Sequence, residues 1–163
     1  MSAVDPLMLR GVLSHYPTGV VLVTATHPDG DDVALVVGTF LSVSLDPPLV
    51  AFLAMQSSRS FTRIRECPTL CFTILGAHQE ASTRTIASRR EDKLAGFSLI
   101  RSPAGNPVPA DSLAWIDATI TDVAQAGDHL AVMCAVQDLA VLHECPPLLF
   151  SQGGYGRFTP IEN

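Results

Sequence analysis

The feature that most constrains the fold is a series of β-branched, apolar segments that follow one another along most of the chain. Such segments favour strands, and long strands joined by turns favour antiparallel pairing over the alternating strand–helix units of a parallel sheet. The expected strands are residues 18–26, 33–44, 49–55, 69–75, 114–123, 129–142 and 148–151, with short helices at 5–14, 60–66 and 79–89. We therefore expect a mainly β protein, a closed antiparallel barrel with a few short peripheral helices.

Turn-forming residues separate these segments. The cluster HPDGDD at 27–32 joins the first two strands as a hairpin, because proline, aspartate and glycine favour tight turns. Pro47 and Pro48 end the second strand, since neither proline can donate a hydrogen bond to a sheet. Asp5 followed by Pro6 is a typical helix start and supports the first helix.

The composition predicts one domain with a large apolar interface. The 163 residues fit a single domain over 1–163, and 47% of them are hydrophobic whereas 16% are charged. An average domain has about a quarter of its residues charged, so we expect a large buried interface. The apolar runs fall short of the roughly 18 residues that a membrane span needs, so no membrane segment is expected. No export signal is recognised, which predicts a cytoplasmic protein with four reduced cysteines.

The charged residues are distributed unevenly. The formal net charge of −6 argues against nucleic acid as a partner, because phosphate binding needs a basic face. Seven of the ten basic residues nevertheless lie between positions 59 and 93, and we call this segment the basic window. Solvated helix faces and a bound anion such as a nucleotide phosphate both remain open as explanations. The seven residues are Arg59, Arg63, Arg65, Arg84, Arg89, Arg90 and Lys93.

The segment TFLSVSLDPPLV at 39–50 places hydroxyl groups in an otherwise apolar strand. Strict alternation predicts that Ser42 and Ser44 share a face with Phe40, opposite Thr39 and Leu41. A hydroxyl in apolar surroundings costs free energy unless it finds a hydrogen-bond partner. Backbone or solvent at a barrel rim could supply that partner, and so could a bound polar ligand.

The motifs of several enzyme classes are absent. The sequence has neither the glycine-rich dinucleotide fingerprint nor the phosphate loop of nucleotide hydrolases, and it has no nucleophile elbow. Cys67 and Cys71 lie four residues apart, but a zinc site that adds His143 and Cys145 is disfavoured, so no metal is expected. His129 follows a Gly-Asp turn, where it is either structural or placed to contact a nicotinamide or a reduced flavin, because imidazole titrates near neutrality.

Several motifs, taken together and in order, resemble the flavin reductase-like family, the small NAD(P)H:flavin oxidoreductases that serve two-component monooxygenases. The resemblance extends from about Tyr16 to Phe158. Its most specific parts are FLSVSLDPPLV at 40–50 and GDH at 127–129. The other matching segments are PTGV at 17–20, SRS at 58–60, Leu75 with Gln79, DK at 92–93, and PLLF at 147–150 with Tyr155.

The resemblance implies a split β-barrel homodimer of the FMN-binding type, built from one flavin reductase-like domain. It further implies that the protein reduces FMN or FAD with NADH or NADPH and delivers the reduced flavin to a partner monooxygenase. The alternative is a flavin-binding barrel that has lost reductase activity or acts on an organic metabolite through bound FMN.

The resemblance also assigns residues to the site. Those lining the flavin are Thr39, Ser42 and Ser44, those at its phosphate are Ser58, Arg59 and Ser60, and those along its other side are Ala87 and Lys93. His129, the candidate catalytic residue, and Tyr155 match positions near the nicotinamide.

The chain departs from the family pattern at three positions. Val36 and Gly38 lie where the family has flavin-contacting residues with a hydroxyl and an amide, and Cys134 replaces a glycine. These changes predict either looser flavin binding, which suits release of reduced flavin, or a changed activity.

Overall fold

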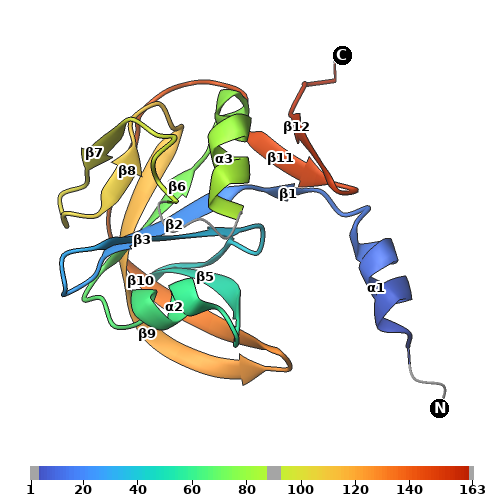
Figure 1. Ribbon diagram of the computed structural model, residues 1–163, viewed down its shortest axis with the longest axis horizontal. Coiled ribbons are helices and arrows are strands. Elements are labelled where there is room, and N and C mark those ends of the chain that lie inside the picture. The colour runs from blue at the N-terminus through green and yellow to red at the C-terminus, as the bar shows by residue number, and fades with distance from the viewer. Residues whose placement is uncertain (1–3, 88–92, 162–163) are drawn as a thin grey trace.

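The computed structural model describes residues 4–87 and 93–161, and it confirms a mainly β fold with short helices (Figure 1). The strands are β1 (Thr18–Gly19), β2 (Val21–Thr26), β3 (Asp32–Val37), β4 (Leu41–Leu45), β5 (Pro48–Met55), β6 (Leu70–Ile74), β7 (Leu99–Arg101), β8 (Pro107–Pro109), β9 (Ala114–Ala126), β10 (His129–Val141), β11 (Leu148–Ser151) and β12 (Gly154–Arg157). The helices are α1 (Pro6–Leu13), α2 (Arg59–Ile64), the 3₁₀ helix η1 (Ala77–Gln79) and α3 (Glu80–Ala87). None of these described helices has the length and apolar character needed to cross a membrane.

The main sheet has seven strands in the order β3-β2-β6-β9-β10-β5-β4, and all neighbours pair antiparallel. β3, at one end of this order, also approaches β5, next to the other end, so the sheet curls back on itself. The two 13-residue strands β9 and β10 form the long hairpin that spans the barrel (Figure 1). A closed antiparallel barrel hides most of its strand edges, which agrees with the expected architecture.

A second sheet of three strands, β1-β11-β12, lies beside the barrel. Val20 is the junction, because β1 ends before it and β2 begins after it. Its amide donates to the Leu148 carbonyl at 3.1 Å, and its carbonyl accepts from the Leu75 amide at 3.3 Å. The Leu148 amide in turn donates to the Leu75 carbonyl at 2.9 Å, so three segments are joined at one point.

The barrel interior is filled by large aromatic and aliphatic side chains. The ring of Phe52 packs edge-on against Phe61 of α2 at 5.8 Å and against Phe72 of β6 at 5.5 Å between centroids. Such aromatic pairs add free energy beyond the area that they bury. Cys134 is also buried in this core, and burial raises the pKa of its thiol to about 12. All four cysteines are free, as expected for reduced thiols.

The expected strand over 33–44 is the clearest error in the sequence-based assignment. The structure divides it into β3 and β4, with a break at residues 38–40 that contains Gly38. The alternation expected for Ser42 and Ser44 is also wrong, because a register shift lies between them. Ser42 stands opposite Val50 and Ser44 opposite Leu49, and consecutive residues of β5 point to opposite faces.

The sequence does not predict strands β7, β8 and β12, because β7 and β8 have three residues each and β8 and β12 contain proline or glycine. β7 and β8 pair as a small hairpin whose loop is held by the buried carboxylate of Asp117 on β9. That carboxylate accepts hydrogen bonds from the Ser102 hydroxyl at 2.8 Å, the Ala104 amide at 3.1 Å and the Asn106 side chain at 3.1 Å. Buried polar groups satisfied in this way are typical of native cores.

The turn between β2 and β3 is tied to α2 by charged groups. Nδ1 of His27 lies 2.9 Å from an Asp29 carboxylate oxygen, and its Nε2 lies 3.0 Å from Glu66. The Arg63 guanidinium of α2 pairs with Asp29 and with Asp31. The hydrogen bond to Glu66, followed by that to Asp29, raises the pKa of His27 above its ordinary value. The turn and the helix are therefore joined most strongly when the imidazole is protonated.

We predict that this contact makes stability depend on pH. Because the folded-state pKa of His27 is raised, its stabilisation is fully present below the unfolded value of about 6.5 and is lost as pH rises through the folded value. His27→Gln should therefore lower the midpoint of urea unfolding more at about pH 6 than at about pH 8.5. His143→Gln, which removes a ring that contacts the Ala110 carbonyl, is the control. An equal effect of His27→Gln at both pH values would contradict the role given to the imidazole.

Candidate functional site

Three side chains form a row across one face of the three-stranded sheet. Thr18 of β1 stands directly opposite Phe150 of β11, and Phe150 stands directly opposite Tyr155 of β12. Residues paired in this way project from the same face of a sheet. The row therefore presents two aromatic rings with a hydroxyl group at each end, and we call it the Thr18–Phe150–Tyr155 row.

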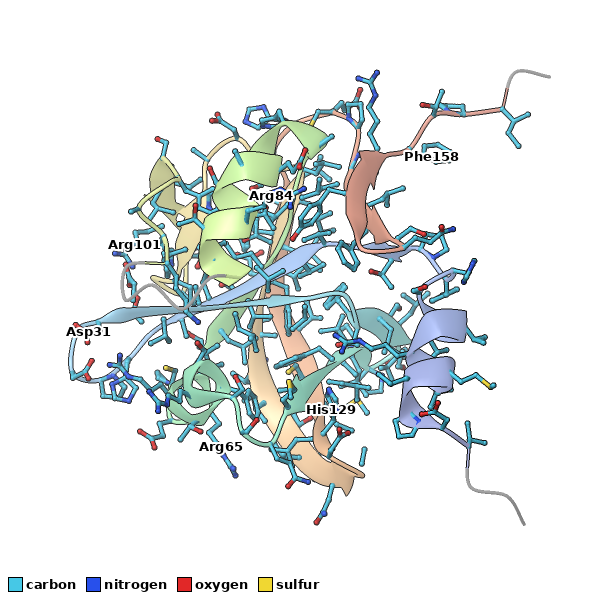
Figure 2. All side chains as sticks on the ribbon, turned by 45° about the vertical axis from the view of Figure 1, so that its right-hand side comes forward. Asp31, Arg65, Arg84, Arg101, His129 and Phe158 are labelled. Carbon is cyan, nitrogen blue, oxygen red and sulfur yellow. The ribbon has the colours of Figure 1, made fainter. Side chains whose placement is uncertain are left out.

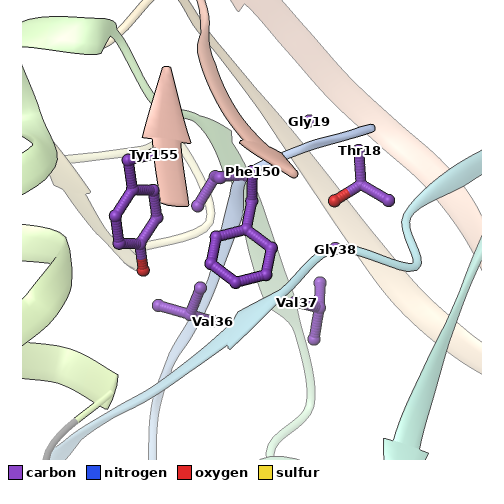
Figure 3. Close-up of a pocket in the computed structure, with 8 residues that line it drawn as sticks. Thr18, Gly19, Val36, Val37, Gly38, Phe150 and Tyr155 are labelled. Atoms are coloured by element: carbon purple, nitrogen blue, oxygen red, sulfur yellow. The ribbon is translucent and has the colours of Figure 1, made fainter. Parts of the chain in front are cut away.

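The end of β3 faces this row and closes a pocket of about 160 Å³ (Figure 3). The hairpin register aligns the two sides, because Val21 of β2 pairs with Val37 of β3 and so brings Gly38 beside the start of the barrel. Aromatic walls with a few polar groups are typical of small-molecule sites. The lining residues are Thr18, Gly19, Val20, Val36, Val37, Gly38, Phe150 and Tyr155.

Gly38 and Thr18 approach each other unusually closely at the edge of this pocket. A Cβ atom built on Gly38 would lie 2.7 Å from the Thr18 hydroxyl oxygen and 3.4 Å from its Cβ. Real Cβ atoms essentially never show the shorter contact. Position 38 therefore excludes a side chain unless Thr18 moves, which is a reason for glycine that the sequence alone did not reveal.

Tyr155 is held from both sides. The Arg84 guanidinium of α3 lies 4.8 Å from the centre of its ring, and Phe150 packs edge-on at 5.2 Å between centroids. Arg84 is itself oriented by Glu80, one helical turn earlier, which accepts from its Nε at 3.0 Å and its Nη2 at 2.7 Å. A cation over an aromatic face and an edge-on ring are both favourable arrangements, so the tyrosine ring has a defined position.

The residues expected at a phosphate lie around the start of α2. Ser58 caps this helix by accepting from the Phe61 amide at 3.2 Å. The Lys93 ammonium donates to the Ser60 hydroxyl at 2.7 Å, which brings together two residues that are 33 positions apart. Arg59 is exposed and has no ion-pair or hydrogen-bond partner in the described part of the chain. α2 and α3 both pack against β3 (Figure 1). The C-terminal end of β3 lines the pocket.

The basic window does not form a single cationic patch among its described residues. Arg63 pairs with the acidic β2–β3 turn and Arg84 with Glu80 and Tyr155, so both have structural partners. Arg65, at the end of α2, points away from the body of the protein in Figure 2. Arg89 and Arg90 lie outside the described residues. Arg59 precedes Ser60 in α2 and Lys93 donates to the Ser60 hydroxyl, so both cations lie near the start of this helix.

The structure places the hydroxyls expected to line a flavin outside this pocket. The Thr39 hydroxyl donates to the Leu53 carbonyl at 3.1 Å and accepts from the Leu53 amide at 3.0 Å. The Thr39 hydroxyl therefore pairs with the backbone of β5 as a neighbouring strand would, next to the break after β3. Of the hydrogen-bond partners that the sequence left open for these hydroxyls, Thr39 has the backbone. Ser42 and Ser44 lie on the edge strand β4, and neither they nor Thr39 lines the pocket.

The described structure of one chain does not bring His129 to the pocket. His129 opens β10 at the tip of the long hairpin, and its Nδ1 lies 2.7 Å from the Asp128 carboxylate. That hydrogen bond lowers the pKa of Asp128 below its ordinary value. Figure 2 places His129 well away from Arg84, the residue that packs on Tyr155. Ala87 ends α3, and its side chain lies outside the described part of the structure.

Of the expected site residues, the structure therefore gathers Val36, Gly38 and Tyr155 in the pocket and Arg59, Ser60 and Lys93 near α2. The sequence motifs alone indicate no role for Thr18 or Phe150, although both residues fall within segments that match the family. A signal for Phe150 was present, because the turn residues at 152–153 predict a two-residue hairpin that pairs Phe150 with Tyr155.

A family model described as "Flavin reductase like domain" matches residues 13–159. A flavin reductase from Pseudomonas putida is 44% identical over 160 residues, which are 98% of this chain and 94% of the relative. The reductase subunit of a flavin-dependent monooxygenase from Rhodococcus jostii is 37% identical over 158 residues, 97% of this chain and 80% of the relative.

Solved structures are similar over nearly the full chain. Nitrilotriacetate monooxygenase component B from Mycobacterium thermoresistibile superposes with a TM-score of 0.90 at 36% identity, covering 97% of this chain and 92% of the other. An NADH:FAD oxidoreductase from Streptomyces globisporus, in complex with NAD and FAD fragments, superposes with a TM-score of 0.90 at 28% identity and covers all of both chains.

Proposed function

The chain belongs to the flavin reductase-like family, and from that premise we propose that it transfers a hydride from NADH or NADPH to FMN or FAD. The reduced flavin would then pass to a partner monooxygenase, as the names of several relatives indicate for those proteins. The observation that carries the proposal is the pocket bounded by the Thr18–Phe150–Tyr155 row and the end of β3, in a chain that matches the family model over nearly its whole length.

The residues present fit a flavin nucleotide. The pocket offers flat apolar surface and two hydroxyls to a ring, and the start of α2 offers Arg59 and Lys93 to a phosphate. An anion next to these two cations would form charge-assisted hydrogen bonds, which are stronger than neutral ones. β3 packs against α2 and its C-terminal end lines the pocket, so one elongated ligand with a ring at one end and a phosphate at the other suits this arrangement.

The chain needs no strong acid or base for this reaction. When bound, the flavin and the nicotinamide supply the hydride chemistry themselves. The protein's part is to hold the two rings in contact and in the correct orientation, which lowers the entropic part of the barrier. Rigid apolar side chains such as Phe150 and the Arg84-supported Tyr155 suit that task.

We further propose that the chain acts in the cytoplasm as a single unit and as a homodimer. Helix α1 projects from the body of the protein in Figure 1 and buries none of its residues. Leu7 is 77% exposed, Met8 66% and Val12 65%, which is unusual for apolar residues on one short helix. Apolar side chains are also exposed on β4, namely Leu41, Val43 and Leu45. A second copy of the chain is the occupant that suits such a surface, because most oligomers are homodimers.

Val36 and Gly38 favour one alternative, a flavin-holding barrel that lacks reductase turnover or acts on an organic metabolite. The valine side chain cannot donate or accept a hydrogen bond and glycine has no side chain, so the contacts that a hydroxyl and an amide would make at these positions are missing. This alternative predicts that flavin binds without consumption of a nicotinamide cofactor, which the following experiment detects.

The purified protein is expected to oxidise NADH or NADPH when FMN or FAD is added under air, at a rate well above that of the same mixture without protein. Loss of absorbance at the reduced nicotinamide band measures the rate. Binding of flavin without consumption of either nicotinamide would favour the alternative, and failure to bind either flavin would exclude both proposals.

Arg59→Ala should raise the dissociation constant of FMN by about 10- to 100-fold, because charge-assisted hydrogen bonds contribute roughly 1.5 to 3 kcal/mol. The matched control is Arg65→Ala, which removes an exposed arginine from the other end of the same helix. Fluorescence titration of FMN measures both constants. Equal affinities for the two variants would remove Arg59 from the phosphate site.

Substitutions on α1 test whether the protein forms the proposed homodimer. Wild-type protein should sediment at twice the monomer mass of 17.3 kDa at micromolar concentration. Replacing both Met8 and Val12 by aspartate should shift it toward the monomer, since a charge on an apolar interface is strongly unfavourable. Arg10→Asp, on the same helix, is the control and should remain dimeric. A monomeric wild-type protein would contradict the homodimer.

A further inference from the structure

The pocket contains two polar side-chain groups, and neither has a partner within the chain. Its lining includes the Thr18 hydroxyl and the Tyr155 hydroxyl, whereas the other side chains are aliphatic, aromatic or glycine. No hydrogen bond joins either hydroxyl to any group in the described residues, although both side chains are partly buried. The hydroxyl of Thr39, next to Gly38 in the chain, behaves differently, because it both donates to and accepts from the backbone of Leu53. A partly buried hydroxyl without a partner is costly unless a ligand or water satisfies it.

The position of the Thr18 side chain is fixed by its surroundings. β1 pairs with β11, which sets the backbone, and the absence of a side chain at position 38 leaves the space that the hydroxyl occupies. Threonine has a stiff side chain because it branches at Cβ. Figure 3 shows the hydroxyl pointing into the space between Phe150 and the end of β3. Gly38 therefore permits Thr18 to direct a donor and acceptor at whatever occupies the pocket.

We propose that Thr18 is a ligand-contacting and specificity-determining residue, whose hydroxyl binds the amide edge of a planar heteroaromatic ring that packs on Phe150 and Tyr155. This inference rests on the proposed function. Two rings of that reaction carry such an edge: the isoalloxazine, through its imide, and the nicotinamide, through its carboxamide. Both present a carbonyl acceptor beside an N–H donor, which matches what one hydroxyl can accept and donate. Gly38 contributes to the same contact, because a side chain at position 38 would displace the Thr18 hydroxyl from its place in the pocket.

The first test removes the hydroxyl while keeping the shape. Thr18→Val should weaken binding of one ring by about two- to tenfold, the effect expected for one neutral hydrogen bond, and Thr18→Ser should restore most of the loss. FMN affinity is measured by fluorescence titration and NAD⁺ affinity by calorimetry, so the two arms identify which ring contacts Thr18. Thr121→Val, on an exposed part of β9, is the control. Each variant's thermal midpoint is measured to verify folding.

A loss confined to FMN assigns Thr18 to the isoalloxazine, and a loss confined to NAD⁺ assigns it to the nicotinamide. Losses for both ligands also support the inference, because the two rings then meet at the row. Unchanged affinities in folded Thr18→Val protein would overturn it. That result would leave the proposed function intact, because wild-type turnover is measured separately.

The second test uses the contact between the two residues. Gly38→Ala places a Cβ against the Thr18 hydroxyl, so it should weaken binding of the same ligand that Thr18→Val affects. Thr18→Ala removes the hydroxyl oxygen, which is the atom nearest to a Cβ at position 38. In Thr18→Ala protein, Gly38→Ala should therefore weaken ligand binding little further. Such non-additivity is the signature of residues that act together. If the two substitutions weaken binding independently, the proposed role of Gly38 is wrong.

Discussion

The architecture of the site depends on the main-chain hydrogen bonds around Val20. There the chain leaves the three-stranded sheet and enters the barrel, and the amides and carbonyls of Val20, Leu75 and Leu148 join three segments. Because backbone groups in a buried junction must be paired, the two sheets cannot shift independently. The junction fixes Thr18, two residues before Val20, and the β2–β3 register brings Gly38 next to the Thr18 side chain. The pocket is thus a consequence of where the two sheets meet.

The polar groups of the protein fall into two classes. Those with structural tasks are satisfied internally: Asp117 holds the β7–β8 loop, Thr39 replaces a strand pairing, and Arg84 supports Tyr155. Those without internal partners in the described chain include the hydroxyls of Thr18 and Tyr155 and the guanidinium of Arg59. These three groups lie at the two places, the pocket and the start of α2, where the proposed function puts a ligand. Groups of this kind are better explained by binding than by folding, since they contribute little to the core.

Much of the fold could be predicted from the chain, because strand and helix signals were strong. The expected strands at 18–26, 114–123 and 129–142 lie almost entirely in strands, and Asp5 caps α1 through the Leu7 amide. Features that depend on tertiary register could not be predicted. The register shift between Ser42 and Ser44 places the two serines on opposite faces of the sheet, and no local residue pattern predicts this shift. Likewise, the reason for Gly38 lies in Thr18, twenty positions away, and the pairing of Lys93 with Ser60 spans 33 positions.

The central claim is that the Thr18–Phe150–Tyr155 row and the end of β3 enclose one ring of the hydride-transfer pair. A crystal structure of the protein with FMN and NAD⁺ tests it most directly. The account predicts a planar ring in contact with Phe150 and Tyr155, with its amide edge at the Thr18 hydroxyl. A structure in which both ligands are bound and neither ring enters this pocket would contradict it.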